Sequence, residues 1–90
     1  MIEVRWSTLA VEDLERIFQR IAEDNPSAAR ETVKSIYSGC EALKSFPHRG
    51  RPGRMRGRRE LIFPPYIAVY QVKGPAVGIS RIYHGAQDWP

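Results

Sequence analysis

The stretch RELIFPPYIAVYQVKGPAVGISRIY, residues 59–83, decides the fold. Pro64-Pro65 and Gly74-Pro75 divide it into three runs rich in β-branched and aromatic residues, which are residues 59–63, 66–72 and 77–83. Because Gly74-Pro75 is typical of a tight turn, the three runs predict an antiparallel meander. The middle run carries no charge and predicts a central strand that is buried on both faces.

Before this meander, the sequence pattern changes from one strand to a helix. Residues 2–6, IEVRW, alternate between apolar and polar side chains and predict a half-buried strand. Ser7 and Thr8 are both suited to cap a helix, and apolar residues then recur at helical spacing at Leu14, Ile17, Phe18, Ile21 and Ala22. The solvent-facing side of this helix is expected to carry Glu12, Asp13, Glu15, Arg16, Arg20 and Glu23.

A second helix follows almost without a linker. Asn25 is suited to cap it, Pro26 to occupy its first position, and we expect it to run to about Ser45, before Phe46-Pro47. Its apolar stripe is Ala29, Val33, Ile36, Tyr37, Cys40 and Leu43. Two helices joined so closely form an antiparallel hairpin. The predicted fold class is therefore α+β, with an N-terminal strand, an antiparallel helix hairpin on one sheet face, and the three-strand antiparallel meander.

Length and composition predict a single small globular domain over residues 1–90. A hydrophobic content of 42% excludes disorder as the default state. The single cysteine, Cys40, excludes an internal disulfide framework and a zinc site of four cysteines, and we expect neither a metal nor a cofactor. No apolar run reaches membrane-spanning length, and the N-terminal residues do not read as a signal peptide. The expected location is the cytoplasm.

The positive charge is concentrated in residues 48–59, HRGRPGRMRGRR, hereafter the arginine segment. It contains six of the 14 basic residues and no acid, so acidic residues outnumber basic ones in the rest of the chain. Its glycines and proline exclude a regular helix and predict a mobile loop. Guanidinium groups suit phosphates and carboxylates, which predicts contact with a target or nucleic acid. The candidate residues are Arg49, Arg51, Arg54, Arg56, Arg58 and Arg59.

Short patterns along the whole chain resemble one known family. They are S…A…DLE.I in the first helix, FP..G after the second helix, Y…VYQV in the central strand, and I.RIYH…D at the end. These patterns lie at Ser7, Ala10, Asp13, Leu14, Glu15 and Ile17, at Phe46, Pro47 and Gly50, at Tyr66 and 69–72, and at Ile79, 81–84 and Asp88. In this order and spacing, the chain resembles the RelE/ParE superfamily of toxins from bacterial type II toxin–antitoxin modules.

The resemblance implies one of two activities on a shared scaffold. RelE-like toxins enter the ribosomal A site and cleave mRNA, which requires an acid, a base and cations for the phosphate. In this sequence the catalytic candidates for that activity are Arg58, Arg59, Arg81, Tyr83 and His84. ParE-like toxins have no catalytic set and instead poison DNA gyrase.

Two positions favour the ParE-like activity. Many RelE-like nucleases have a basic residue directly after the aromatic that begins the central strand, whereas this chain has Ile67. The spacing of His84 and Asp88 is also more similar to the ParE-like ending. The sequence is therefore interpreted as a plasmid or chromosomal toxin that inhibits DNA gyrase. A ribosome-dependent endoribonuclease acting on mRNA and an inactive toxin-like binding module remain the alternatives.

The resemblance also implies a cognate antitoxin as a partner. A basic toxin suits an acidic antitoxin segment that folds on binding, and such a segment is expected to cover the groove between the helix hairpin and the sheet. Trp89, close to the end of the sequence, has little core to join, so contact with a partner and packing within the chain stay equally open.

Structural roles compete with the functional ones at several positions. His84 is expected to be a hydrogen-bonded residue at a strand end, and Arg81 to face water or to pair with Glu60. Tyr66, Tyr70 and Tyr83 are expected to pack across strands, and Cys40 to be an inert core thiol.

Overall fold

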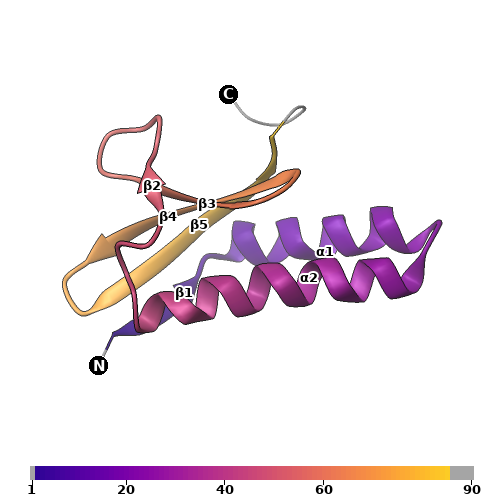
Figure 1. The fold of residues 1–90 in the computed structure, drawn as a ribbon, viewed down its shortest axis with the longest axis horizontal. Coiled ribbons are helices and arrows are strands. Elements are labelled where there is room, and N and C mark those ends of the chain that lie inside the picture. Colours follow the sequence, from indigo (N-terminus) through magenta and orange to yellow (C-terminus); the bar gives the residue numbers. More distant parts are fainter. Residues whose placement is uncertain (1, 86–90) are drawn as a thin grey trace.

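The structure, a computed structural model, describes residues 2–85. Its elements follow the chain in the order β1 (Glu3–Trp6), α1 (Thr8–Ala22), α2 (Pro26–Glu41), η1 (Ala42–Lys44), β2 (Arg51–Pro52), β3 (Arg59–Phe63), β4 (Tyr66–Lys73) and β5 (Ala76–His84). The strands form one sheet in the order β1-β5-β4-β3-β2. Both helices lie on the same face of this sheet (Figure 1). The predicted α+β fold with its helix hairpin and meander is confirmed.

The N-terminal strand lies beside the last strand in space. β1 pairs in parallel with the first half of β5, from Glu3 opposite Ala76 to Trp6 opposite Ile79. β5 then pairs antiparallel with β4, and β4 with β3. β4 is thus the central strand of the five, as its uncharged sequence predicts.

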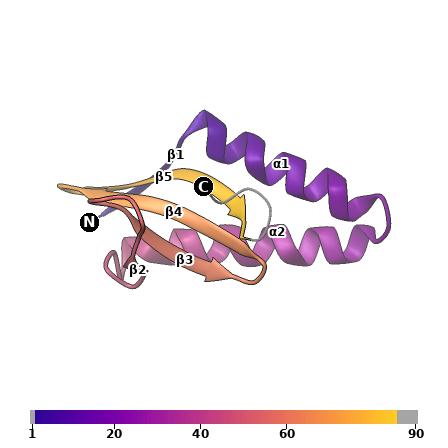
Figure 2. The same cartoon turned by 90° about the horizontal axis from the view of Figure 1, so that it is seen from above.

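The helix hairpin begins and turns at capped positions. The Ser7 hydroxyl accepts the Ala10 amide at 3.0 Å, and the Asn25 side chain accepts the Ala28 amide at 3.1 Å. Pro26 occupies the first turn of α2. α1 runs along β5 and α2 lies under β3 (Figure 2). These caps satisfy amides that the helices themselves leave unpaired, which fixes where each helix starts.

The core lies between the helices and the sheet. It consists of Ala10, Ile36, Cys40 and Leu43 from the helical part and Tyr66, Ala68, Tyr70, Val77, Ile79 and Ile82 from the sheet. Tyr66 and Tyr70 are buried, as expected of packing tyrosines. Cys40 is fully buried, and burial raises the pKa of its thiol to about 12, which fits an inert core residue.

Two predictions about α2 are wrong. The α-helix ends at Glu41 and continues as a 3₁₀ turn through Lys44, so it is shorter than the predicted helix to about Ser45. Tyr37, predicted in the apolar stripe, is 50% exposed. Its ring stacks on Trp6 with centroids 5.6 Å apart, and the Trp6 indole also donates to the Glu41 carboxylate of α2 at 3.0 Å. An aromatic side chain can thus be packed on one face while the other stays in solvent.

Candidate functional site

The arginine segment is folded around one buried carboxylate, that of Glu60. Glu60 is 3% exposed; its carboxylate accepts the Arg51 Nε at 2.9 Å and the Arg54 amide at 3.3 Å. Arg51 and Pro52 form β2, the short strand that pairs with the start of β3. The Gly53 amide closes the segment by donating to the Arg58 carbonyl at 2.7 Å. The segment is therefore not a wholly irregular loop, and its acid partner is the residue that directly follows it.

A second anchor fixes the start of the segment. The hydroxyl of Tyr70, a fully buried residue, accepts the Gly50 amide at 2.8 Å and donates to the Pro47 carbonyl at 2.9 Å. A Cβ atom at Gly50 would lie 2.7 Å from that hydroxyl and 2.8 Å from the Glu60 carbonyl, so only glycine fits here. Burial raises the pKa of Tyr70, and the hydroxyl remains a neutral donor.

The six arginines of the segment do not all have the same role. Arg59 donates to the carbonyls of Gly50 at 2.7 Å and His48 at 3.3 Å, so it holds the segment from within. Arg58 donates to the Ser80 hydroxyl at 3.1 Å and lies against the sheet. Arg49, Arg51, Arg54 and Arg56 are exposed. Those four guanidinium groups form the positively charged surface that the sequence predicts.

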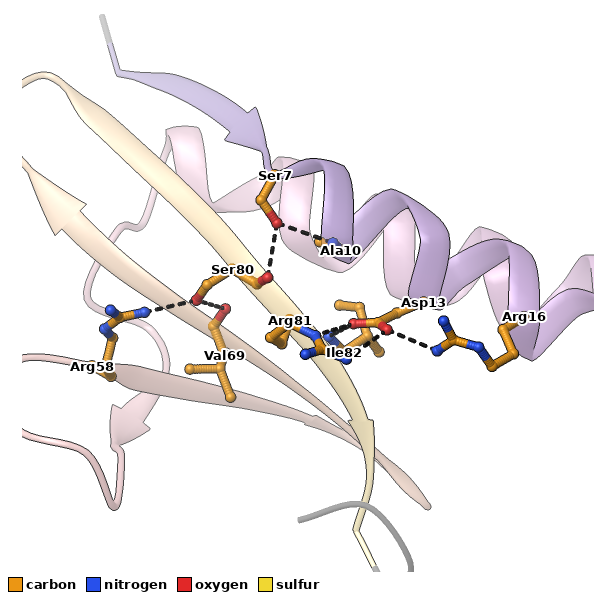
Figure 3. A network of polar contacts seen from close by, with 9 residues as sticks. All are labelled: Ser7, Ala10, Asp13, Arg16, Arg58, Val69, Ser80, Arg81 and Ile82. Carbon is orange, nitrogen blue, oxygen red and sulfur yellow. Dashed lines mark hydrogen bonds and ion pairs between the residues drawn. The ribbon is translucent and has the colours of Figure 1, made fainter. Parts of the chain in front are cut away.

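The prediction for Asp13 is wrong. The sequence pattern places Asp13 on the solvent-facing side of the first helix, whereas in the structure it is 2% exposed. Its carboxylate accepts Arg81 Nε at 2.9 Å and Nη2 at 3.1 Å, the Ile82 amide at 2.9 Å and the Arg16 Nη1 at 3.0 Å (Figure 3). Burial alone would raise the pKa of Asp13, but the hydrogen bonds from Arg81, Ile82 and Arg16 outweigh burial and lower it.

The reason for this position is the short length of β1. β1 ends opposite Ile79, so the edge of β5 beyond that residue has no strand beside it. Side chains of α1 take the place of the missing strand: Ser7 donates to the Ser80 carbonyl at 2.8 Å, and Asp13 accepts the Ile82 amide. A buried strand edge needs such partners. The alternative pairing of Arg81 with Glu60 is wrong, because Arg81 binds Asp13 and Glu60 binds Arg51.

The residues of the predicted nuclease set are only partly brought together. The guanidinium carbon of Arg81 lies 5.3 Å from the centroid of the Tyr83 ring. Tyr83 pairs with Ile67, whereas His84 pairs with Tyr66, a core residue, and meets its ring edge-on at 5.5 Å. Adjacent residues of a strand point to opposite faces, so Tyr83 and His84 diverge. His84 instead lines a cavity of about 20 Å³ with Asp13 and Tyr66 on the helix side.

Trp89 and Asp88 lie outside the described residues. Within residues 2–85, no cluster of side chains is suited to hold a metal ion. None of the helices in that range is long and apolar enough to cross a membrane.

Comparison with known proteins agrees across sequence and structure. The family model described as "ParE toxin of type II toxin-antitoxin system, parDE" matches residues 4–89. The chain is 37% identical to "Putative toxin Y4kP" of Sinorhizobium fredii over 89 residues, which is 97% of this chain and 92% of the relative. It is 32% identical over 87 residues to "Toxin RelE2" of Caulobacter vibrioides, 97% of this chain and 99% of that protein. A solved structure, "Chromosomal ParDE TA system from P. aeruginosa", is similar with a TM-score of 0.82 at 28% identity, over 93% of this chain and 96% of that one.

Proposed function

We propose that this chain, which belongs to the ParE toxin family of type II toxin–antitoxin systems, acts by poisoning DNA gyrase. The observation that carries this proposal is the arginine segment. Its exposed guanidinium groups project from a backbone that Glu60 and Tyr70 hold in place. A fixed cationic surface loses less conformational entropy on binding than a free loop does. It is therefore suited to gyrase, to the DNA that gyrase holds, or to both.

In this mechanism the chain is a binding module rather than an enzyme. By occupying gyrase together with its cleaved DNA, the toxin would prevent resealing of the break. The expected site of action is the cytoplasm, where gyrase and its DNA are found. No residue of the chain has to transfer a proton or form a bond. This agrees with the divergence of Tyr83 and His84, two candidate acid–base side chains that strand alternation sends to opposite faces of the sheet.

Inhibition of this toxin is assigned to a cognate antitoxin. One similar solved structure is described as a ParDE system, which supports a paired protein for this chain as well. The surplus of basic residues favours an acidic antitoxin segment. Such a segment would cover the groove between the helix hairpin and the sheet.

A second candidate function is ribosome-dependent mRNA cleavage. The contact of Arg81 with the Tyr83 ring favours it, as does the name of the Caulobacter relative. Against it, Arg81 is held by the buried Asp13, and Arg59 is turned toward Gly50 and His48. An inactive binding module is the third candidate.

A gyrase cleavage assay tests the proposal directly. Purified toxin is incubated with gyrase, ATP and supercoiled plasmid, and the reaction is stopped with detergent and protease. We expect linear DNA that depends on the toxin. Supercoiling that proceeds unchanged with no linear product would refute gyrase poisoning, and codon-positioned mRNA cuts on translating ribosomes would then support the second candidate.

Two sets of substitutions test the role of the arginine segment. Replacing the exposed Arg49, Arg54 and Arg56 with alanine should raise the toxin concentration needed for half-maximal cleavage by about tenfold, because three cationic contacts are lost. The control removes the same charge from exposed positions of the helical part, at Arg30, Lys34 and Lys44. Equal loss in both sets would mean that net charge, not the segment, determines the effect.

A further inference from the structure

A groove lies on the sheet face turned away from the helices, outside the arginine segment except for Arg58. Its volume is about 290 Å³, and its floor is β5 at Gly78. Gly78 pairs with Arg5 of β1 on one side and with Gln71 of β4 on the other. Its neighbours Val77 and Ile79 are core residues on the helix side, so position 78 faces the opposite side.

Three cations border this groove, which are Arg5 of β1, Lys73 of β4 and Arg58, the residue directly before β3. Within residues 2–85, no carboxylate lines it. Ser7, the N-cap of α1, also lines it, so the positive end of that helix dipole is close. The groove therefore has the electrostatic character of a site for anions.

Arg58 is held in position before any ligand arrives. Its Nη1 donates to the Ser80 hydroxyl at 3.1 Å, and that hydroxyl donates to the Val69 carbonyl at 3.0 Å (Figure 3). Ser80 is available for this contact because the pairing of β4 and β5 shifts register between Val69 and Tyr70. Four of the five guanidinium donors of an arginine remain for a ligand after one such bond.

Arg5 is also available. It pairs with Glu3 at 3.1 Å, but the two side chains are 68% and 63% exposed. An ion pair as exposed as this contributes little and exchanges readily with another anion. β1 and β4 lie on either side of β5, about 9.6 Å apart by strand spacing. Lys73 is displaced by a further two residues along β4, because it pairs with Ala76 whereas Arg5 pairs with Gly78. That separation suits successive phosphates of a strand better than one isolated phosphate.

Gly78 leaves the centre of the groove empty. A Cβ atom placed there meets nothing within 4 Å, and only Gly57 and Gly74 among the described glycines have positive φ. The backbone therefore does not require glycine at position 78. The consequence of having no side chain is open space between the cations.

We propose that this groove binds the phosphodiester backbone of a nucleic-acid strand, with Arg5, Arg58 and Lys73 on its phosphates and Gly78 as the floor. Arg58 is the next-to-last residue of the arginine segment, so the strand continues from that segment onto the sheet. The inference goes beyond the proposed function, because the strand binds with or without gyrase. The chain can bind a strand in this groove without poisoning gyrase, and it can poison gyrase without binding a strand here.

The test measures binding of a fluorescein-labelled single-stranded DNA of about twelve nucleotides by fluorescence anisotropy. Gly78→Glu places a carboxylate in the groove and should weaken binding about tenfold. Gly78→Ala adds only a methyl group in open space and should bind within about twofold of the unchanged chain. Ser38→Glu, on the exposed side of α2, changes the net charge equally and is the matched control.

A second measurement does not depend on whether Gly78→Glu folds. Arg5→Ala and Lys73→Ala should each reduce the slope of log K against log salt by about 0.7, while Lys44→Ala should leave it unchanged. The proposal is overturned if Gly78→Glu binds like Ser38→Glu, or if the slopes of the two groove variants match that of Lys44→Ala. The proposal is also overturned if a mononucleotide displaces the labelled strand as well as an unlabelled strand does at the same concentration of phosphate groups. The groove would then be a mononucleotide site.

Discussion

Replacing Asp13 with alanine should separate α1 from the edge of β5. The substitution removes the carboxylate that accepts the Ile82 amide, and an unpaired buried amide costs about 1–3 kcal/mol. It also leaves Arg81 without its carboxylate. Loss of one partner from a fully buried pair costs about 3–5 kcal/mol, but the Arg81 side chain is 36% exposed and regains water, so we take about 1 kcal/mol for this part. The expected loss is about 3 kcal/mol of unfolding free energy.

Urea unfolding followed by circular dichroism measures this loss. Asp13→Asn keeps one carbonyl oxygen for the Ile82 amide but turns an amide donor toward Arg81, so it should lose less than Asp13→Ala. Glu12→Ala, one residue earlier and exposed, is the control and should change stability by less than about 0.5 kcal/mol. A loss below about 1 kcal/mol for Asp13→Ala would refute the argument that this carboxylate replaces a missing strand.

The same carboxylate gives an acid dependence with a definite sign. The folded-state pKa of Asp13 is lowered, so its contribution is fully present above the unfolded pKa of about 3.9 and is lost as pH falls through the folded value. Urea midpoints measured from pH 7 to pH 3 should therefore fall at the acid end. The fall should be smaller in Asp13→Asn, and equal falls in both proteins would contradict this assignment.

Three further results are expected. Glu60→Gln weakens the bond to Arg51 and should reduce hydrogen-exchange protection of the Arg54 amide about tenfold; unchanged protection would mean that Glu60 does not hold the arginine segment. Tyr70→Phe leaves the buried Gly50 amide without its acceptor and should cost about 1–3 kcal/mol in urea unfolding, against less than 1 kcal/mol if water replaces the hydroxyl. Cys40 should react with Ellman's reagent at pH 8 at least about a hundredfold more slowly in the native protein than in urea, and rapid native labelling would contradict its burial.

The sequence predicts the elements of this fold well because each is encoded locally. The caps at Ser7 and Asn25, the breaks at Pro64-Pro65 and Gly74-Pro75, and the apolar spacing between them all act within a few residues. Where local pattern and packing agree, the boundaries are correct to within one or two residues for every strand of the meander.

The sequence does not reveal contacts that depend on distant pairing. Asp13 looks like any other acid on a charged helix face, and its partner Arg81 lies 68 residues away. The burial of Asp13 follows from the length of β1, which no residue near Asp13 encodes. The close spacing of Arg81, Tyr83 and His84 in the sequence also suggests one site, although strand alternation sends Tyr83 and His84 to opposite faces.

The sequence predicts the charge of the arginine segment but not its conformation. It suggests Glu60 only as a partner for Arg81, and nothing in the pattern of glycines and arginines indicates a turn around the Glu60 carboxylate. Gly50 gives the one local signal, because a glycine at a point of close approach to Tyr70 is required sterically. The need for glycine at position 50 can be recognised only once the Tyr70 ring is known to lie next to it.

The parallel pairing of β1 with β5 also governs when the molecule can form during its synthesis. Residues 3–6 leave the ribosome well before their partners, residues 76–79, and β5 separates β1 from every other strand. The helix hairpin can form early from local contacts, whereas the sheet cannot close until translation reaches β5. A nascent toxin therefore has no complete sheet surface to present to a target until β5 has been synthesised, and the groove on the sheet described above arises only then.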